Sequence, residues 1–238
     1  MKENKRTIGI EQYIPIELIN NTILEYLETR DINKDELFQR MLEYNKGINR
    51  AKKATNSIYS IMTKTSSVNK ALLRNFTVAF YNQLSETEKN IVAMSLVCLR
   101  YPFIFDTLTA FGKLFNVQDT VNRQYITQTL AATYGSNRTL EIALDAVLRI
   151  VVESGFIHRE KPGLFSQGNF LCVCDFIKET WISTFFELNG KKSLLVAELE
   201  YEPALSYLDN MEINWNETKI LATEKDYSNQ VIITRLKI

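Results

Sequence analysis

Residues 134–165 read YGSNRTLEIALDAVLRIVVESGFIHREKPGLF, and the expected fold class follows from the order of signals within them. A short turn containing Gly135 leads into a segment whose apolar residues recur at helical spacing, and Gly155 then favours a left-handed helix end. Two short apolar segments follow, on either side of the turn Lys161-Pro162-Gly163, and they predict a β-hairpin. With a further helix expected over residues 119–133, this is the order of a winged helix-turn-helix.

The residues before this stretch predict a series of short helices. Pro15 suits the first turn of a helix that runs to about Thr29. Two later helices begin with a capping pattern, a Ser or Asn followed three residues later by Glu, at Asn33/Glu36 and Ser85/Glu88. Pro102 precedes another helix, expected over residues 103–115.

The last third of the chain has mixed signals. Residues 175–188 predict a helix rich in aromatic side chains, and residues 230–238 predict a strand that pairs with residues 218–223. We therefore expect a mainly α protein with a helical N-terminal part that holds a basic helix, a central winged-helix-like part and a small α+β C-terminal part. We place these parts at residues 1–100, 101–170 and 171–238.

Composition limits the function classes. The chain has 238 residues, of which 45% are hydrophobic, and its pI near 6.6 excludes a globally basic protein. The longest apolar run, Ile91 to Leu99, is much shorter than the roughly 20 residues of a membrane span, so we expect no membrane span. The charged N-terminus does not have the pattern of a secretory signal, and together with the cysteine usage this leads us to expect a cytoplasmic protein. Three cysteines do not make a disulfide framework.

The sequence has no strong sign of an enzyme. Cys172 and Cys174 have only His158 and Cys98 as further zinc ligands, and two buried thiols on one face of a strand is the simpler interpretation. His158 has no evident nucleophile beside it, and neither a phosphate-binding glycine loop nor a zinc-protease motif occurs. We expect no metal, no cofactor and no catalytic residue.

The stretch from Tyr44 to Ser85 contains no Asp or Glu. The whole chain balances 28 basic against 28 acidic residues, so the charge of +7 in this stretch leaves −7 for the remainder. Such segregation creates a local positive field, which a polyanion would be attracted to. The seven basic residues are Lys46, Arg50, Lys52, Lys53, Lys64, Lys70 and Arg74.

A helix over residues 46–64 would place four of these cations in one stripe, at about 100° per residue. The stripe consists of Lys46, Arg50, Lys53 and Lys64, with Ser57 and Ser60 between them. The opposite side would carry Ile48, Ala51, Ile58, Ile61 and Met62. Lys, Arg and Ser are common donors to phosphate oxygens, although a charged helix face is also often only solvated, or paired with acids elsewhere in the protein.

The expected recognition helix has opposing signals. Asn137, Arg138 and Thr139 lie at its start, where major-groove readers usually place their contacts, and Arg159 and Lys161 lie in the hairpin. However, Glu141 and Asp145 share the exposed face of that helix and would repel phosphates. A module of this kind can equally serve protein contact.

Several stretches resemble, in their order, the BrxA family of the bacterial BREX phage-exclusion systems. They are a short amphipathic helix ending at Leu27-Glu28, residues 35–44 (DELFQRMLEY), residues 50–58 (RAKKATNSI), residues 97–106 (VCLRYPFIFD) and residues 139–157. The resemblance covers roughly residues 15–170. The chain departs from the family in its longer C-terminal part, from about residue 169, and in its neutral charge.

The resemblance implies a mostly helical, non-enzymatic protein that binds double-stranded DNA together with other phage-defence proteins. The family match falls on Arg50, Lys53 and their neighbours and on the helix that opens at Asn137. The alternatives are a scaffold subunit whose basic face meets an acidic protein, or, with no motif behind it, a hydrolase. The expected DNA contacts are Lys46, Arg50, Lys52, Lys53, Ser57, Lys64, Asn137, Arg138, Thr139, Arg159 and Lys161.

Overall fold

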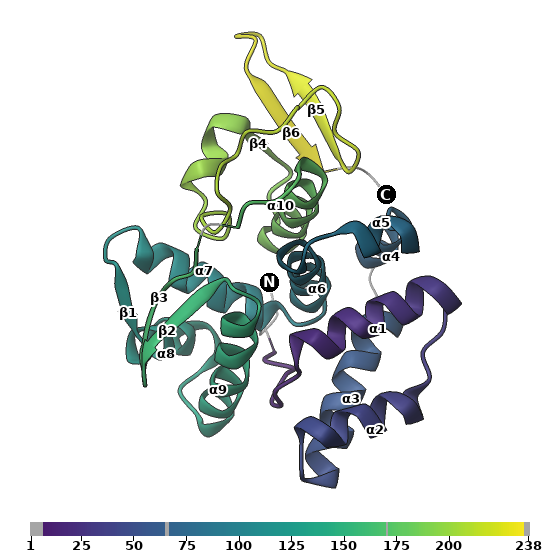
Figure 1. Ribbon diagram of the computed structural model, residues 1–238. Helices are drawn as coiled ribbons and strands as arrows, with labels where there is room; N and C mark the ends of the chain where they lie inside the picture. Colours follow the sequence, from purple (N-terminus) through teal and green to yellow (C-terminus); the bar gives the residue numbers. More distant parts are fainter. Residues whose placement is uncertain (1–6, 65–66, 170, 236–238) are drawn as a thin grey trace, which may run out of the picture.

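The protein is described by a computed structural model that covers residues 7–64, 67–169 and 171–235 (Figure 1). Helices dominate this part of the chain, and two small antiparallel sheets lie within its second half. The mainly α fold expected from the sequence is confirmed.

The first two helices begin where local signals predict them, and the basic helix expected from residue 46 begins at Ile48. Pro15 precedes α1, and the side chain of Asn33 accepts hydrogen bonds from the backbone N–H groups of Asp35 and Glu36 at the start of α2. The turn between α2 and α3 is short, so these helices pack as neighbours. Their bounds are α1 Ile16–Thr29, α2 Lys34–Tyr44 and α3 Ile48–Thr63.

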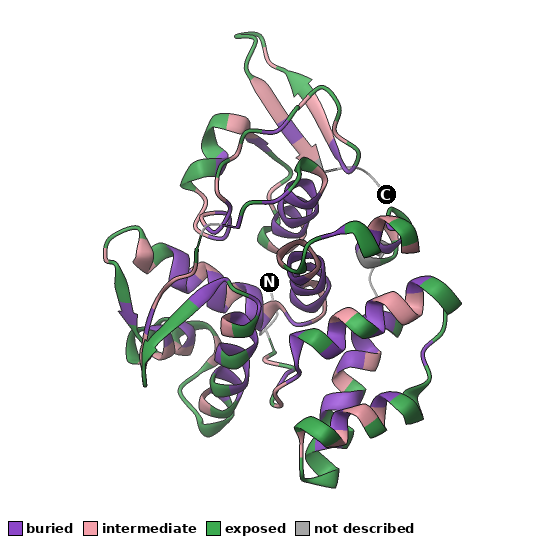
Figure 2. Ribbon diagram, viewed as in Figure 1, coloured by how far each residue is buried: buried purple, intermediate pink, exposed green. Residues whose placement is uncertain are grey.

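Helix α6 lies at the centre of the molecule, and Figure 2 shows it almost wholly buried. It packs against α1, α3, α7 and α10, and every residue from Asn90 to Cys98 is buried. Ser85 and Glu88 form the capping box that their spacing predicts. The bounds in this region are α4 Ser67–Arg74, α5 Val78–Gln83, α6 Glu86–Arg100 and α7 Pro102–Phe115.

The central segment adds a three-stranded sheet to three helices. The predicted hairpin forms as β2 and β3, and Gly155 before it has φ 85°. The helix predicted from residue 119 instead begins at Arg123, because residues 120–122 form a strand that pairs with β3. The sheet order is β1-β3-β2, with β1 Thr120–Asn122, α8 Arg123–Tyr134, α9 Arg138–Glu153, β2 Ile157–Lys161 and β3 Leu164–Gln167.

The C-terminal segment combines one helix with a second small sheet. The predicted helix forms, and the predicted terminal strand forms over Val231–Arg235, while residues 236–238 of that prediction lie outside the described residues. The partner strand begins at Leu221, three residues later than expected. The β5–β6 hairpin projects from the body of the molecule (Figure 1). The sheet order is β4-β6-β5, with α10 Asp175–Asn189, β4 Ser193–Leu195, the 3₁₀ helix η1 Val196–Tyr201, β5 Leu221–Lys225 and β6 Val231–Arg235.

Two expectations about this segment are wrong or incomplete. Cys172 and Cys174 are exposed rather than buried, because Leu171 and Val173 take the buried side of this segment, and residues 172–174 form no strand. Strand β4 carries no clear local signal, and it forms through pairing with β6.

One continuous cluster of buried side chains runs through all three segments, from Ile10 to Ile233. No single helix in the described ranges has the length and apolarity of a membrane span; α6 and α7 have them only when taken together, as a pair bent by 115°.

Candidate nucleic-acid interface

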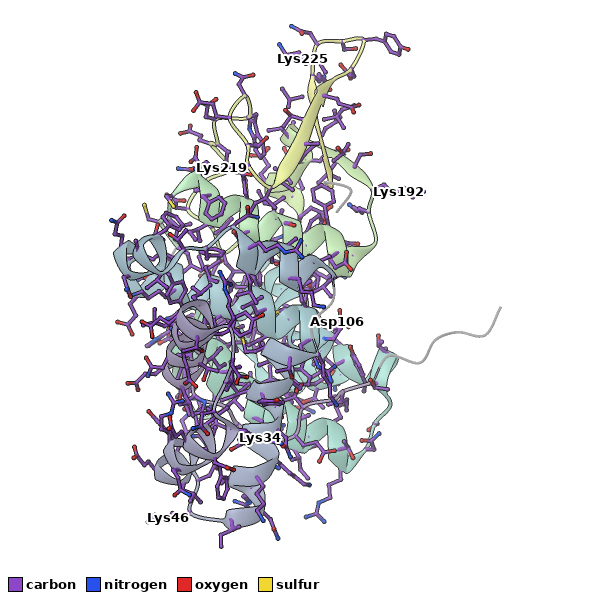
Figure 3. The ribbon with its side chains drawn as sticks, turned by 90° about the vertical axis from the view of Figure 1, so that its right-hand side faces the viewer. Lys34, Lys46, Asp106, Lys192, Lys219 and Lys225 are labelled. Carbon is purple, nitrogen blue, oxygen red and sulfur yellow. The ribbon has the colours of Figure 1, made fainter. Side chains whose placement is uncertain are left out.

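The cations of the acid-free stretch all reach solvent. Each of the seven Lys and Arg residues between Tyr44 and Ser85 is exposed. Lys46 lies at one end of the molecule, and Lys219 and Lys225 lie toward the other end (Figure 3). Within the described ranges, no acid lies at ion-pair distance from Lys46, Arg50 or Lys52. Their charges are therefore free to act on a ligand.

Most residues predicted for the apolar side of α3 are buried in the structure. Ala51, Ile58, Ile61 and Met62 are buried in the core. Ile48 is 61% exposed instead, because it is the first residue of the helix and lies before the turn at which burial begins. The helical wheel thus predicts the buried side correctly except at its first turn.

The predicted cationic stripe does not run the whole length of the helix. Ser60 is buried rather than exposed, because the hydroxyl of Tyr101 covers it at 3.0 Å and also donates to the backbone carbonyl of Ser57 at 3.2 Å. Arg100 donates to the hydroxyl of Ser60 at 2.9 Å. Only the N-terminal half of the stripe stays open, and Lys64, at the helix end, is separated from it.

Two stripe residues already have partners. The Nζ atom of Lys53 lies 4.0 Å from Oε2 of Glu11, and both side chains are largely exposed, so this pair is weak and screened by salt. Ser57 is half-buried, and its hydroxyl donates to the carbonyl of Lys53. Lys52 lies about 200° around the helix from Arg50, beside residues of α2. The exposed N-terminal half of α3 therefore carries cations on two sides, with Arg50 on one and Lys52 on the other.

The start of α9 carries the second group of predicted contacts. Asn137 is the N-cap, and its side-chain oxygen accepts the N–H of Leu140, so that oxygen is committed to the helix. Arg138 and Thr139 are exposed in the first turn.

The two acids on the exposed face of α9, Glu141 and Asp145, are partly neutralised by an arginine. Arg123, the first residue of α8, donates from Nη2 to Glu141 at 2.6 Å and to Asp145 at 2.9 Å. Partial burial lowers the pKa of Arg123, but the hydrogen bonds and charges of the two carboxylates outweigh it and raise that pKa. Sequence spacing alone could not predict this pairing, because Arg123 lies on another helix.

The hairpin contacts lie at the opposite end of α9. Arg159 is exposed on β2, and its guanidinium carbon lies 5.5 Å from the centroid of the Phe165 ring. Lys161 is exposed at the end of the same strand.

Residues 7–15 lie between α3 and α9 (Figure 1), and only part of this segment is buried. Ile10 and Ile14 have no exposed surface. Glu11 reaches Lys53 of α3, and Tyr13 reaches Glu153 of α9. This segment thus connects α3 to the C-terminal end of α9, a link that sequence analysis missed.

A polar cleft of about 590 Å³ lies beside the hairpin. Its wall includes His158, Glu160 and Ser166, and His158 is the cross-strand partner of Ser166. The hydroxyl of Ser166 donates to Glu160 at 2.5 Å rather than to the imidazole, so these residues do not form a serine–histidine nucleophile pair. In the described part of the chain, no three His, Cys, Asp or Glu side chains gather as metal ligands would.

The chain matches no model of a protein family, no curated protein and no solved structure.

Proposed function

We propose that this protein binds double-stranded DNA, mainly through the phosphate backbone and without catalysis, as a component of a bacterial phage-defence system. The observation that carries the proposal is the charge distribution around α3. Seven cations in a stretch without acids are all exposed, and three of them, Lys46, Arg50 and Lys52, have no acidic partner among the described residues. Phosphate contacts of this kind give affinity without reading sequence.

We infer that residues 102–167 form a winged helix-turn-helix that adds to this contact. The inference is supported by the order α7, β1, α8, α9, β2, β3, by the sheet order β1-β3-β2 and by the short turn at Gly135 between α8 and α9. Arg138 and Thr139 would then contact the groove, and Arg159 and Lys161 the backbone. Pairing of Glu141 and Asp145 with Arg123 lowers the repulsion that these acids would otherwise cause.

The phage-defence setting rests on the resemblance to the BrxA family. In this setting, we propose that the protein acts in the cytoplasm together with other phage-defence proteins. A genetic test is deletion of the gene in a phage-resistant host, with phage plating efficiency as the measurement. Restored plating that a wild-type copy reverses would support the setting, whereas unchanged plating would contradict it.

Duplex affinity as a function of salt tests DNA binding. A backbone-led binder should give a log–log slope of about −0.9 per phosphate contacted. Combined reversal of two cations, Arg50→Glu with Lys53→Glu, is expected to abolish binding. The matched control is Lys219→Glu with Lys225→Glu, which changes the net charge equally at the other end of the molecule (Figure 3). Equal losses in both pairs would show that only net charge matters and would contradict the assignment of α3.

A scaffold role is the second candidate, because apolar side chains lie beside the same cations. Tyr44 is 42% exposed and Ile48 is 61% exposed, next to the open half of α3. Exposed apolar groups with adjacent charge are typical of protein interfaces. If the wild type fails to bind duplex DNA even at low salt, this surface is better explained by an acidic protein partner.

A further inference from the structure

The C-terminal segment contains a second stretch whose charge has one sign. Residues 193–218 hold six acids and no Lys or Arg, so the charge of this stretch is −6. It is the counterpart of the acid-free stretch between Tyr44 and Ser85, and it is nearly as large as the −7 of everything outside that stretch. The six acids are Glu198, Glu200, Glu202, Asp209, Glu212 and Glu217.

A groove of about 610 Å³, here called the acidic groove, lies within this stretch. Two acids of its wall, Glu200 and Glu212, are exposed, and in the described ranges neither lies at ion-pair distance from a Lys or Arg. The third, Asp209, pairs with Lys178 at 3.3 Å. The Tyr201 hydroxyl donates to Glu200 and leaves the carboxylate charge in place. The groove therefore has two uncompensated negative charges.

Apolar side chains line and border the acidic groove. Its wall includes Val196 and Met211, which are both half-buried. Val117 and Tyr201 directly follow wall residues in the chain, and their side chains are 78% and 74% exposed. Exposed apolar groups beside uncompensated charge are typical of a surface that binds another protein. This combination indicates a cationic protein surface, rather than a small ion, as the ligand.

The start of α3 has the complementary chemistry. Lys46 and Arg50 are exposed cations without an acidic partner among the described residues, and Tyr44 and Ile48 are exposed apolar side chains beside them. These four residues are here called the basic end. In Figure 1 the turn between α2 and α3 lies at the bottom of the molecule, whereas β4 and the segment after it lie toward the top. No ion pair in the described ranges joins the two surfaces, so each is open to another molecule.

We propose that the acidic groove binds the basic end of a second copy of this protein. Charge complementarity selects this occupant, because each surface has two uncompensated charges of opposite sign and two large exposed apolar side chains. Lys46 and Arg50 of one copy meet Glu200 and Glu212 of the other, and the apolar side chains pack around them. The contact does not rest on the proposed DNA binding, although both use Lys46 and Arg50. It identifies the acidic partner that the scaffold alternative requires.

Sedimentation velocity over a range of protein concentrations measures self-association of the full chain. The wild type is expected to associate at low salt. High salt should weaken the association by about tenfold, because the contact depends on opposite charges that salt screens. A wild type that stays monomeric at low salt would overturn the proposal.

Two charge-reversal variants locate the contact: Lys46→Glu with Arg50→Glu, and Glu200→Lys with Glu212→Lys. Each alone should be monomeric, because its basic end and its groove then have charges of the same sign. An equal mixture should associate, because the intact groove of the first variant meets the intact basic end of the second. Self-association of either variant alone, or a mixture that stays monomeric, contradicts the assigned surfaces. Glu200→Gln with Glu212→Gln keeps the side-chain shapes, and it should weaken association about tenfold even if a reversal variant fails to fold.

The matched control is Glu28→Lys with Glu224→Lys, which makes the same change in net charge as the groove reversal at exposed acids outside the groove. It should associate as the wild type does, and an equal loss in this control would show that net charge, not the groove, governs association. All of these measurements are made without DNA. A failure of duplex binding therefore leaves their result unchanged, and a failure of self-association leaves the test of duplex binding unchanged.

Discussion

The hydroxyl of Tyr13 donates to Oε1 of Glu153 at 2.5 Å, although the two residues are 140 positions apart in the chain. The guanidinium of Arg149 lies 3.7 Å from the centroid of the Tyr13 ring, so Tyr13 binds α9 by both its face and its hydroxyl. Two residues earlier, Glu11 reaches Lys53 of α3. Residues 7–15 therefore contact both the basic helix and the C-terminal end of α9, and the contact with α9 is the stronger of the two.

Tyr13→Phe is expected to lower the free energy of unfolding by about 1 kcal/mol at neutral pH, because it removes one hydrogen bond and keeps the ring. Urea denaturation measures this loss. Tyr26→Phe is the control, because no described residue forms a hydrogen bond with the Tyr26 hydroxyl. If the proposed DNA interface spans both helices, Tyr13→Phe also weakens duplex binding. Equal stability of the two variants would contradict the assigned role.

The same contact predicts a pH dependence. Burial, followed by the hydrogen bond and charge of Glu153, raises the pKa of Tyr13 well above its ordinary value. A tyrosine with a raised pKa in the folded state contributes stability that is fully present below the unfolded pKa, near 10, and is lost as pH rises above it. Unfolding curves at pH 8 and pH 10.5 should therefore differ less for Tyr13→Phe than for the wild type. Tyr81 and Tyr207 also have raised pKa values, so part of the dependence should remain.

Local signals predicted most helices because their causes are local. The cap at Asn33, the capping box at Ser85 and the left-handed residue at Gly155 each depend on neighbours within a few positions. Strand β1 had no such signal. Thr120 pairs with Ser166, and that contact arises only when distant segments meet.

The same distinction applies to the candidate interface. Helical spacing predicted the exposed cations in the first half of α3, although it placed Ile48 on the buried side. It could not predict that Tyr101, 41 positions away, covers Ser60, or that Arg123 pairs with two acids of α9. These contacts lie between elements, and they decide how much of the cationic surface stays open.

Arg123→Gln is expected to weaken duplex binding several-fold if α9 takes part in it. The substitution leaves Glu141 and Asp145 without their cation on the exposed face of the helix. Lys113→Gln makes the same change in net charge at an exposed position on α7 and serves as the control. Fluorescence anisotropy at two salt concentrations measures both. Equal affinities for the two variants would indicate that α9 lies outside the DNA contact.

Gly112→Ala tests how closely α7 approaches the C-terminal segment. Helix propensity alone would favour Ala by about 1 kcal/mol. However, a Cβ atom at Gly112 would lie 2.0 Å from the carbonyl oxygen of Pro203, which is backbone and cannot simply rotate away. We therefore expect a net destabilisation of about 2 kcal/mol, typical of overpacking.

Gly163→Ala is the useful comparison. A Cβ atom added at Gly163 would meet no atom within 4 Å, and the backbone there has φ +78°. Its cost should come from the left-handed backbone alone, about 1 kcal/mol. Thermal unfolding ranks the two variants. If Gly112→Ala were as stable as the wild type, residues 203–206 would have to pack less closely on α7 than the structure indicates.

Glu179 anchors the β5–β6 hairpin to α10. Its side chain is nearly fully buried, and one carboxylate oxygen, Oε2, accepts the backbone N–H groups of Lys219, Ile220 and Leu221. The preceding residue, Lys178, donates from its Nζ atom to the side-chain oxygen of Asn210 and forms an ion pair with Asp209. Two adjacent charged residues thus hold two separate loops.

Glu179→Gln is expected to destabilise the protein by about 2 kcal/mol, because neutral hydrogen bonds replace charge-assisted ones. Glu179→Ala should cost more, since it leaves three N–H groups, two of them buried, without this acceptor. Hydrogen exchange should accelerate at the amides of residues 219–221 in both variants and stay unchanged in Glu217→Gln, an exposed acid nearby in the chain. Duplex binding should not change, because the hairpin and Lys46 lie at opposite ends of the molecule (Figure 3). Loss of DNA binding in Glu179→Gln, with the fold intact, would move the interface toward the hairpin and away from α3.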